Sequence, residues 1–310
     1  MKWIKNGLIY CPEGQYYWNK THAQIPLSFI VDDDTLRIYY SSRDEYNRSN
    51  LSYIEVEINN PSVIKYIHNK PLLNFGHLGE FDDSGIMPSC IVRMDGKTYL
   101  YYTGWNVGVN IHYILAIGLA ISEDNGRTFT KFSNGPILDR SVYDPCLCAS
   151  PAIILESKIL RMWYISGTKW EIINNRPEPF YHIKYAYSYD GINWIREGKV
   201  CIDYDSFTEG ISRPSILKRG EKYFLFYSYR NNLNYRANKE NGYRIGFAIS
   251  DDGLKWERKD KEIGIYFSNG GWDSEMMAYP NVLPHKDQLY MFYNGNGFGR
   301  TGFGYAVLEE

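Results

Sequence analysis

Short apolar runs alternate with short polar turns along the whole chain. A proline followed by two apolar strands around a polar turn appears five times. The copies read IPLSFIVDDDTLRIYYSS, MPSCIVRMDGKTYLYYTG, SPAIILESKILRMWYISG, RPSILKRGEKYFLFYSYR and YPNVLPHKDQLYMFYNGN. Their prolines, which we call the marker prolines, lie 62 to 66 residues apart and are Pro26, Pro88, Pro151, Pro214 and Pro280. Self-similarity at a fixed period indicates a repeat architecture.

A second repeated element is an acidic turn with glycine that ends on an aromatic residue. Its copies are SEDNGRTF from Ser122, SYDGINW from Ser188 and SDDGLKW from Ser250. Such turns resemble the Asp boxes of sialidases. We expect their aspartates to accept backbone hydrogen bonds, their glycines to adopt positive φ, and Phe129, Trp194 and Trp256 to pack between neighbouring repeats.

The pattern predicts an all-β fold, because no stretch shows a sustained helical period. Strands such as residues 223–228 are apolar on both faces, as expected for sheets packed between neighbours. Five repeats of three or four strands predict a five-bladed β-propeller, with residues 1–310 as one domain. A pair of β-sandwiches is the rival architecture, but a regular five-fold repeat argues against it.

Composition removes several classes of function. The net charge is −2 and the pI is about 6.3, so there is no basic field for nucleic acid or for a membrane surface. Apolar runs are too short to span a bilayer, and the N-terminus lacks a signal-peptide core, so we expect a cytoplasmic protein. The five cysteines are odd in number and irregularly spaced, which does not fit a disulfide framework.

The marker prolines locate a candidate site. A proline at the first residue of a strand loses only a donor that the ladder does not use. We therefore expect each marker proline to begin an innermost strand, and the residues before it to face the central axis. These residues differ between repeats while the frame stays constant, so function can reside there.

Acidic residues gather just upstream of these prolines. The position five before the proline holds Asp83, Glu209 and Glu275 in three of the repeats. If these side chains converge on one funnel, one carboxylic acid can protonate a leaving oxygen while a carboxylate activates water. The alternative is that they cap turns or pair with arginines. Asp82 and Asp144, also upstream of marker prolines, are candidates either for substrate contacts or for structural roles.

Arginines and aromatic residues lie in the same elements. Several arginines facing one funnel indicate an anionic ligand, because the guanidinium fork fits carboxylate and phosphate; pairing with surface acids is the alternative. Aromatic rings can stack on sugars. The remaining candidates for substrate binding are His22, Gln24, Arg43, Trp105, Trp170, Arg213, Tyr229, Arg230, Tyr279 and Arg300. No histidine spacing predicts a metal site.

Together, the repeats, the acidic turns and the upstream acids resemble the superfamily of five-bladed propeller glycoside hydrolases. That superfamily includes arabinanases, levansucrases, invertases and mannoside phosphorylases. Strings such as FDDSGIMPS, WDSEMMAYP and NGNGFGRTGFG are similar to a glycosylase-like subgroup associated with bacterial surface-polysaccharide biosynthesis. The resemblance implies a carbohydrate ligand and no obligatory cofactor, although it allows Ca²⁺ on the axis. The first repeat lacks the aspartate that arabinanases carry there, so their catalytic residues cannot be transferred.

Three hypotheses follow for function. The first is an inverting glycoside hydrolase or transglycosylase that acts on a charged or activated sugar, with Asp83 and Glu275 as the acid/base pair in either order and Glu209 tuning the pair or binding substrate. The second is a phosphorylase or glycosyltransferase whose arginines hold phosphate or a nucleotide sugar. The third is a carbohydrate-binding propeller without catalytic activity.

Overall fold

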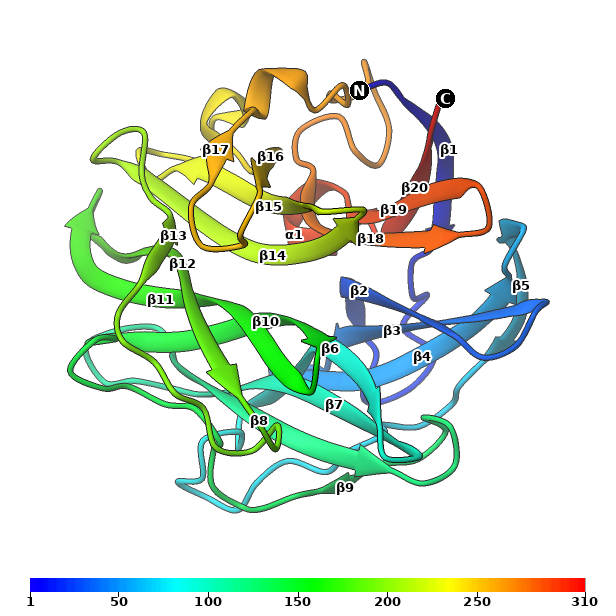
Figure 1. The fold of residues 1–310 in the computed structure, drawn as a ribbon, viewed down its shortest axis with the longest axis horizontal. Helices are drawn as coiled ribbons and strands as arrows, with labels where there is room; N and C mark the ends of the chain where they lie inside the picture. The colour runs from blue at the N-terminus through cyan, green and yellow to red at the C-terminus, as the bar shows by residue number, and fades with distance from the viewer. Residues whose placement is uncertain (310) are drawn as a thin grey trace.

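The computed structural model describes residues 1–309 and is built almost entirely of β-strands (Figure 1). The helical segments in this range are short: α1 (Asn296–Gly299) and two 3₁₀ turns, η1 (Lys239–Asn241) and η2 (Asp260–Glu262). The prediction of an all-β fold is confirmed. No helix in the described range is long and apolar enough to cross a membrane.

The strands pair antiparallel in sets of four that follow chain order. The first set is β2 (Thr21–Ile30), β3 (Thr35–Arg43), β4 (Ser49–Glu57) and β5 (Asn60–Ile67). The second is β6 (Gly85–Met94), β7 (Lys97–Asn106), β8 (Ile114–Ser122) and β9 (Thr130–Lys131). The third is β10 (Leu147–Glu156), β11 (Ile159–Ile173), β12 (Arg176–Ser188) and β13 (Val200–Ile202).

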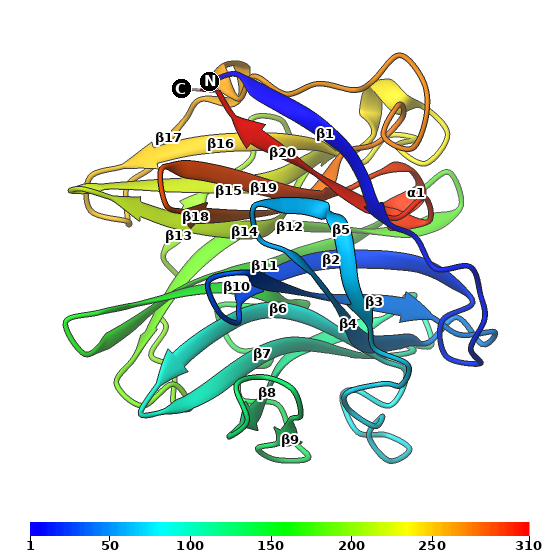
Figure 2. The same ribbon diagram turned by 90° about the vertical axis from the view of Figure 1, so that its right-hand side faces the viewer.

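Two further sets complete the molecule. One is β14 (Glu209–Arg219), β15 (Lys222–Asn231), β16 (Arg244–Ser250) and β17 (Glu257–Arg258). The last contains β18 (Ala278–His285), β19 (Gln288–Asn294) and β20 (Phe303–Leu308), and its outer strand is β1 (Trp3–Tyr10) from the other end of the chain. The pairing of β1 with β20 runs from Trp3–Leu308 to Tyr10–Phe303 (Figure 2).

The sets are not all separate sheets. Ser49 of β4 pairs in parallel with Gly85 of β6, which joins the first two sets into one eight-stranded sheet. The described residues therefore form four hydrogen-bonded sheets. The joint lies where the second set begins, at the first residues of β4 and β6.

The marker prolines lie inside the inner strands and not at their first residue, which corrects the sequence-based expectation. Each proline sits at or beside a register shift in its strand. Four of the preceding residues adopt positive φ: Ile25 (57°), Ser150 (46°), Arg213 (52°) and Tyr279 (57°). A β-bulge leaves one residue out of the ladder, so the missing proline N–H costs no hydrogen bond.

The acidic glycine turns have the predicted structure. The carboxylates of Asp124, Asp190 and Asp252 each accept two backbone N–H hydrogen bonds at 2.8 to 3.0 Å. Their glycines have φ between +73° and +77°. The aromatic residue of each turn packs on the preceding set: Phe129 on Tyr39, Trp194 on Tyr101 and Trp256 on Trp163, with ring centroids 5.9 to 6.1 Å apart.

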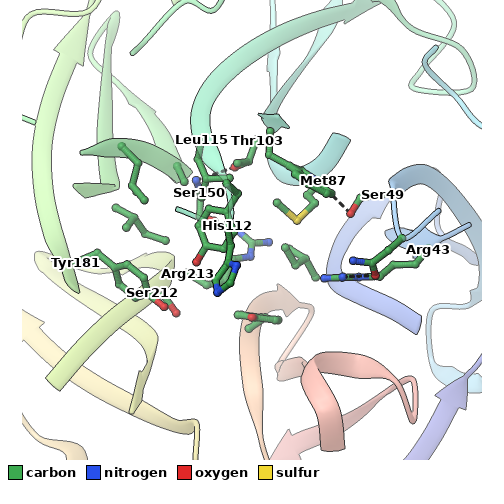
Figure 3. Close-up of a pocket in the computed structure, with 18 of the residues that line it drawn as sticks. Arg43, Ser49, Met87, Thr103, His112, Leu115, Ser150, Tyr181, Ser212 and Arg213 are labelled. Carbon is green, nitrogen blue, oxygen red and sulfur yellow. Dashed lines mark hydrogen bonds between the residues drawn. The ribbon is translucent and has the colours of Figure 1, made fainter. Parts of the chain in front are cut away.

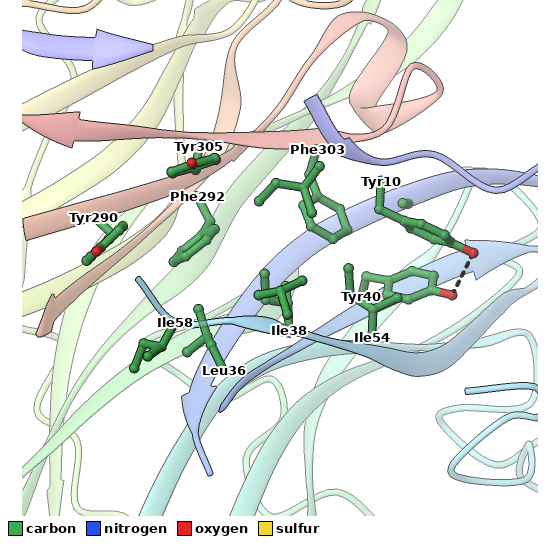
Figure 4. Close-up of a cluster of buried hydrophobic side chains, with 13 residues drawn as sticks. Tyr10, Leu36, Ile38, Tyr40, Ile54, Ile58, Tyr290, Phe292, Phe303 and Tyr305 are labelled. Carbon is green, nitrogen blue, oxygen red and sulfur yellow. Dashed lines mark hydrogen bonds between the residues drawn. The ribbon is translucent and has the colours of Figure 1, made fainter. Parts of the chain in front are cut away.

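Apolar side chains fill the spaces between neighbouring sets. Figure 4 shows the cluster between the first and last sets, where residues of β3 and β4 meet residues of β19 and β20. The labelled members include Leu36, Ile38, Ile54, Phe292 and Phe303. Similar clusters lie between the other neighbours. The core is therefore divided into wedges around the centre, and this arrangement holds the inner strands in fixed positions.

Candidate functional site

The inner strands of all five sets meet at a central cavity of about 440 Å³. The five residues that precede the marker prolines all line it, namely Ile25, Met87, Ser150, Arg213 and Tyr279. Figure 3 shows Met87, Ser150 and Arg213 pointing toward one another across this space. The sequence-based expectation that these positions share one central space is confirmed.

The bulged residues are held by the neighbouring set. The backbone N–H of Ile25 donates to Asn294 Oδ1 at 2.6 Å, and that of Ser150 donates to Thr103 Oγ1 at 2.9 Å. The N–H of Tyr279 donates to Ser228 Oγ at 2.7 Å in the same way. These bonds replace the ladder partners lost at the bulges. They also connect adjacent sets at the cavity wall, so the wall is rigid.

Arginines dominate the charge of the cavity. Arg43, Arg176, Arg213 and Arg236 line it, together with His112, and none of its lining residues within the described range is Asp or Glu. The rest of the wall is mostly aromatic, aliphatic or small. The aromatic members are Tyr46, Trp105, Tyr113, Tyr181, Tyr243 and Tyr279. A cationic pocket with aromatic walls suits a sugar that carries negative charge.

Arg213 is the most unusual member of this wall. Its side chain is 1% exposed, and Nη1 donates to the carbonyl of Ser89 at 2.6 Å. Its Nε and Nη2 have no hydrogen-bond partner, and no carboxylate within residues 1–309 forms an ion pair with it. Burial lowers the pKa of Arg213 to about 10, so the side chain remains charged at neutral pH. A buried, unpaired cation is costly unless an anion joins it.

The other arginines have different surroundings. Arg43 is held by neutral partners, since its Nε donates to Gln24 Oε1 at 2.9 Å and its Nη1 to Asn47 Oδ1 at 2.6 Å. Arg236 and Arg176 pair with buried Glu178, at 3.2 and 3.5 Å. Glu178 is thus the counter-ion behind the wall, and Arg43 and Arg213 supply charge that no carboxylate of residues 1–309 neutralises.

The three acids predicted as catalytic do not line this cavity. Half-buried Asp83 accepts from the Gly79 N–H and from Ser84 Oγ. Buried Glu209 makes two hydrogen bonds of 2.8 Å with Arg258. Exposed Glu275 lines a separate cavity of about 270 Å³, which Arg236 also borders. The three carboxylates thus do not meet at the central cavity: a local turn holds Asp83, Arg258 holds Glu209, and Glu275 borders the separate cavity.

Asp82 and Asp144 are also absent from the wall and are fully buried in the scaffold. Asp82 accepts from Tyr102 Oη at 2.9 Å and pairs with Lys131 at 2.7 Å. Asp144 accepts from Tyr164 Oη at 3.1 Å and pairs with Arg196 at 2.9 Å. Each aspartate lies upstream of a marker proline and accepts a hydrogen bond from a tyrosine of the second strand of its set, β7 or β11. This repeated pairing ties the entry loop to the strand beside it.

Of the residues predicted to bind substrate, Arg43, Trp105, Arg213 and Tyr279 line the central cavity. Gln24 and Arg230 lie one layer behind it, in contact with lining residues. The others are not among the lining residues: His22, Asp82, Asp144, Trp170, Tyr229 and Arg300. Burial, followed by the charges of Arg43 and Arg300, lowers the pKa of His22 to about 4, so its ring is neutral at pH 7.

Sequence reasoning missed several residues of the wall. Arg176 and Tyr181 lie on β12, which with β11 forms a hairpin longer than its counterparts. Arg236 and Tyr243 lie between β15 and β16, in a connection of twelve residues that contains η1. The available signal was the longer stretch between the marker proline and the next repeated strand, which is 32 residues from Pro151 to Ile183 and 31 from Pro214 to Ile245, against 29 from Pro88 to Ile117. Insertions in a repeat fold collect in loops on one face, often the binding face.

The axial Ca²⁺ allowed by the resemblance does not fit this donor set. Ca²⁺ takes six to eight oxygen ligands, among them carboxylates. The wall offers four arginines instead, and they would repel a divalent cation. In the part of the chain that the structure describes, no group of three His, Cys, Asp or Glu side chains is placed to hold a metal.

Comparison with known structures supports the fold assignment. A glycosyl hydrolase from Bacteroides ovatus superposes with a TM-score of 0.70 at 17% identity, covering 100% of this chain and 90% of the other. A second structure superposes with a TM-score of 0.69 at 19% identity, covering 100% of this chain and 90% of the other. It belongs to the GH130 family of mannoside phosphorylases, which contains glycoside hydrolases that target β-1,2 mannosidic linkages in Candida mannan. The chain thus has a propeller-like fold of the glycoside hydrolase type.

Sequence relatives are of two kinds, and no protein-family model matches the chain. A β-1,2-mannobiose phosphorylase of Thermoanaerobacter sp. is 30% identical over 107 residues, which is 32% of this chain and 34% of that protein. Two Mycobacterium tuberculosis proteins, "Uncharacterized protein Rv1502" and "Uncharacterized protein MT1551", are each 37% identical to this chain over 311 residues, which is 100% of this chain and 100% of each relative. The chain belongs to the same protein family as these two mycobacterial proteins.

Proposed function

We propose that this protein is a glycosidase-type, carbohydrate-active enzyme that acts on a sugar carrying a negatively charged group, inside the central cavity. In this proposal the five sets of four strands are the five blades of a single propeller domain. β1 completes the last blade from the N-terminal end. The fold type of its structural neighbours and the position of the cavity on the common centre of the inner strands support the assignment.

One observation supports the proposal that the substrate is negatively charged. Arg213 is buried at the cavity wall without a counter-ion, and Arg43 adds a second guanidinium held only by neutral groups. A wall that contains four arginines and no carboxylate among its described residues accommodates a sugar carboxylate, a sugar phosphate or inorganic phosphate. The rings of Trp105, Tyr113 and Tyr279 supply apolar faces for the sugar.

A second candidate is phosphorolysis, in which the same arginines hold inorganic phosphate as the attacking group. The sequence match to the β-1,2-mannobiose phosphorylase favours it over part of the chain. A direct water mechanism by a carboxylate pair is less favoured, because Asp83, Glu209 and Glu275 do not meet in this cavity. Transfer to another acceptor sugar would use the same site with a hydroxyl in place of water.

The test separates these reactions by their products. The protein is incubated with 4-nitrophenyl glycosides, including the glucuronide and the β-mannoside, and with β-1,2-mannobiose. Each reaction is run with and without inorganic phosphate, and products are separated by anion-exchange chromatography. A sugar 1-phosphate formed only with phosphate identifies a phosphorylase, and free sugar identifies a hydrolase. Ligand binding without any turnover would identify a carbohydrate-binding propeller and refute the proposal.

A further inference from the structure

Two tyrosine hydroxyls meet at the wall of the central cavity. Tyr181 of β12 and Tyr243, just before β16, both line the cavity, and their hydroxyl groups are hydrogen-bonded to each other. Both side chains are buried, at 7% and 2% exposure. Figure 3 shows Tyr181 at the edge of the space that Ser212 and Arg213 also face. The pair joins two adjacent blades at the site itself.

The arrangement leaves one hydroxyl proton without a partner. Two hydroxyls joined by one hydrogen bond use one of their two protons, and neither oxygen has another partner within residues 1–309. Either hydroxyl can donate in this hydrogen bond, and burial raises the pKa of Tyr181 well above its usual range, so Tyr181 keeps its proton and can donate it to Tyr243. The proton of Tyr243 is then free to hydrogen-bond a group inside the cavity.

A buried cation stands behind both rings. The guanidinium carbon of Arg230 lies 5.4 Å from the ring centroid of Tyr181 and 5.2 Å from that of Tyr243. Arg230 is 2% exposed, and its nearest carboxylate, Glu178, is 3.9 Å away. A nearby positive charge favours the ionised form of an acid. A negative charge that develops on Tyr243 would therefore be stabilised by Arg230 and by the hydrogen bond from Tyr181.

The cavity needs such a group if it cleaves glycosides. Protonation of the leaving oxygen is part of glycosidic bond cleavage, and tyrosine can act as a general acid. No carboxylate among the described lining residues can do this, and His112 is exposed at the mouth. The tyrosine pair is the buried acidic group that the wall does contain.

We propose that Tyr243 is the catalytic acid of this site and that Tyr181 and Arg230 are its positioning residues, an inference that rests on the proposed function. Tyr243 Oη gives its proton to the glycosidic oxygen as the bond from that oxygen to the anomeric carbon breaks. Water or hydrogen phosphate attacks the anomeric carbon and loses one proton. That proton returns to the Tyr243 oxygen, so the enzyme is restored and the products are the free alcohol and either the sugar or the sugar phosphate.

The test compares two leaving groups on the sugar that the wild-type protein turns over best. A 4-nitrophenyl glycoside departs with little help from an acid, whereas the methyl glycoside of the same sugar needs protonation. We expect Tyr243→Phe to lose about 10²- to 10⁴-fold in kcat/KM on the methyl glycoside, and less than about tenfold on the 4-nitrophenyl glycoside. Tyr181→Phe should show the same selectivity with a smaller loss, and it serves as the second variant if Tyr243→Phe does not fold.

The chain offers a matched control in a second buried tyrosine pair. The hydroxyls of Tyr40 and Tyr10 lie 3.3 Å apart in the core cluster of Figure 4, away from the cavity. Tyr40→Phe removes a comparable hydrogen bond and should leave both rates unchanged. Equal losses on the two glycosides, or no loss at all in Tyr243→Phe, would overturn the role of Tyr243 while the proposed function stands. Absence of turnover by the wild-type protein would overturn both.

Discussion

The unpaired guanidinium of Arg213 should make the empty protein less stable than it could be. We expect Arg213→Met to raise stability in the absence of ligand, because methionine fills similar space without charge. The variant should also lose the response to anions. The substitution should therefore raise the free energy of unfolding and weaken anion binding at the same time. This combination is the mark of a charge retained for function.

The magnitude follows from the pKa. Burial lowers the pKa of Arg213 from 12.5 to about 10, which corresponds to a cost on the order of 3 kcal/mol for the charged form in the fold. Because the folded-state pKa of this base is depressed, the cost is fully present below pH 10 and disappears only as the pH rises above it. Loss of the hydrogen bond to the Ser89 carbonyl subtracts about 1 kcal/mol. The expected net gain at pH 7 is about 2 kcal/mol.

Urea denaturation at pH 7, with and without anions, measures both effects. Inorganic phosphate or glucuronate at a hundred times its dissociation constant should stabilise the wild-type protein by about 2.7 kcal/mol and the Arg213→Met variant hardly at all. Sodium chloride at equal ionic strength controls for screening. A variant less stable than the wild type without ligand would refute the reasoning about desolvation. Equal stabilisation of both proteins by phosphate would refute the placement of the anion at Arg213.

Three further predictions concern the scaffold around the site. Glu209→Gln should lower the free energy of unfolding by about 1–3 kcal/mol in urea titrations, because Arg258 loses one of two buried hydrogen bonds and the negative charge of its partner; an unchanged midpoint would show that the pair contributes nothing. Gly85→Ala should cost about 1–3 kcal/mol and weaken sugar binding in calorimetry, since the new Cβ would lie 1.9 Å from Trp105 Nε1. Partial burial acts to raise the pKa of Asp124, but hydrogen bonds from Thr128 and its neighbours lower it to about 2. Its stabilising effect is therefore present above about pH 4 and lost as the pH falls toward 2, and Asp124→Asn should flatten that part of an acid-unfolding curve monitored by circular dichroism.

The repeat allowed much of the fold to be predicted. The period located the inner strands, and Asp190 with Gly191 identified a turn whose hydrogen bonds are local in sequence. The period also predicted that the residues before the marker prolines lie at the centre, because every copy of a repeat contributes an equivalent inner strand. What the pattern could not show was the bulge, because a one-residue shift in pairing leaves the apolar periodicity of the flanking residues intact.

Whether an acid upstream of a marker proline faces the central cavity could not be predicted from its position alone. Glu209 stands in the same register as Asp83, yet its carboxylate is taken by Arg258, 49 residues away in the chain. Asp144 is likewise held by Arg196, 52 residues away. Arg258 lies in the outer strand β17, and Arg196 lies in the connection that leads to the outer strand β13. Because the sequence pattern does not show which basic side chain reaches back to which acid, it cannot distinguish a carboxylate that is free to react from one that is already paired.

The pairing of β1 with β20 has a consequence for how the protein is made. The last set borrows its outer strand from the first ten residues, so the N-terminal strand has no partner until residues 303–308 have been synthesised. During translation the first set can form before the last set has been synthesised. Until then, the apolar surface of Leu36, Ile38 and Ile54 is not covered by Phe292 and Phe303. A nascent chain that stalls before that point would expose this surface and a free strand edge, which are features that chaperones and aggregation both recognise.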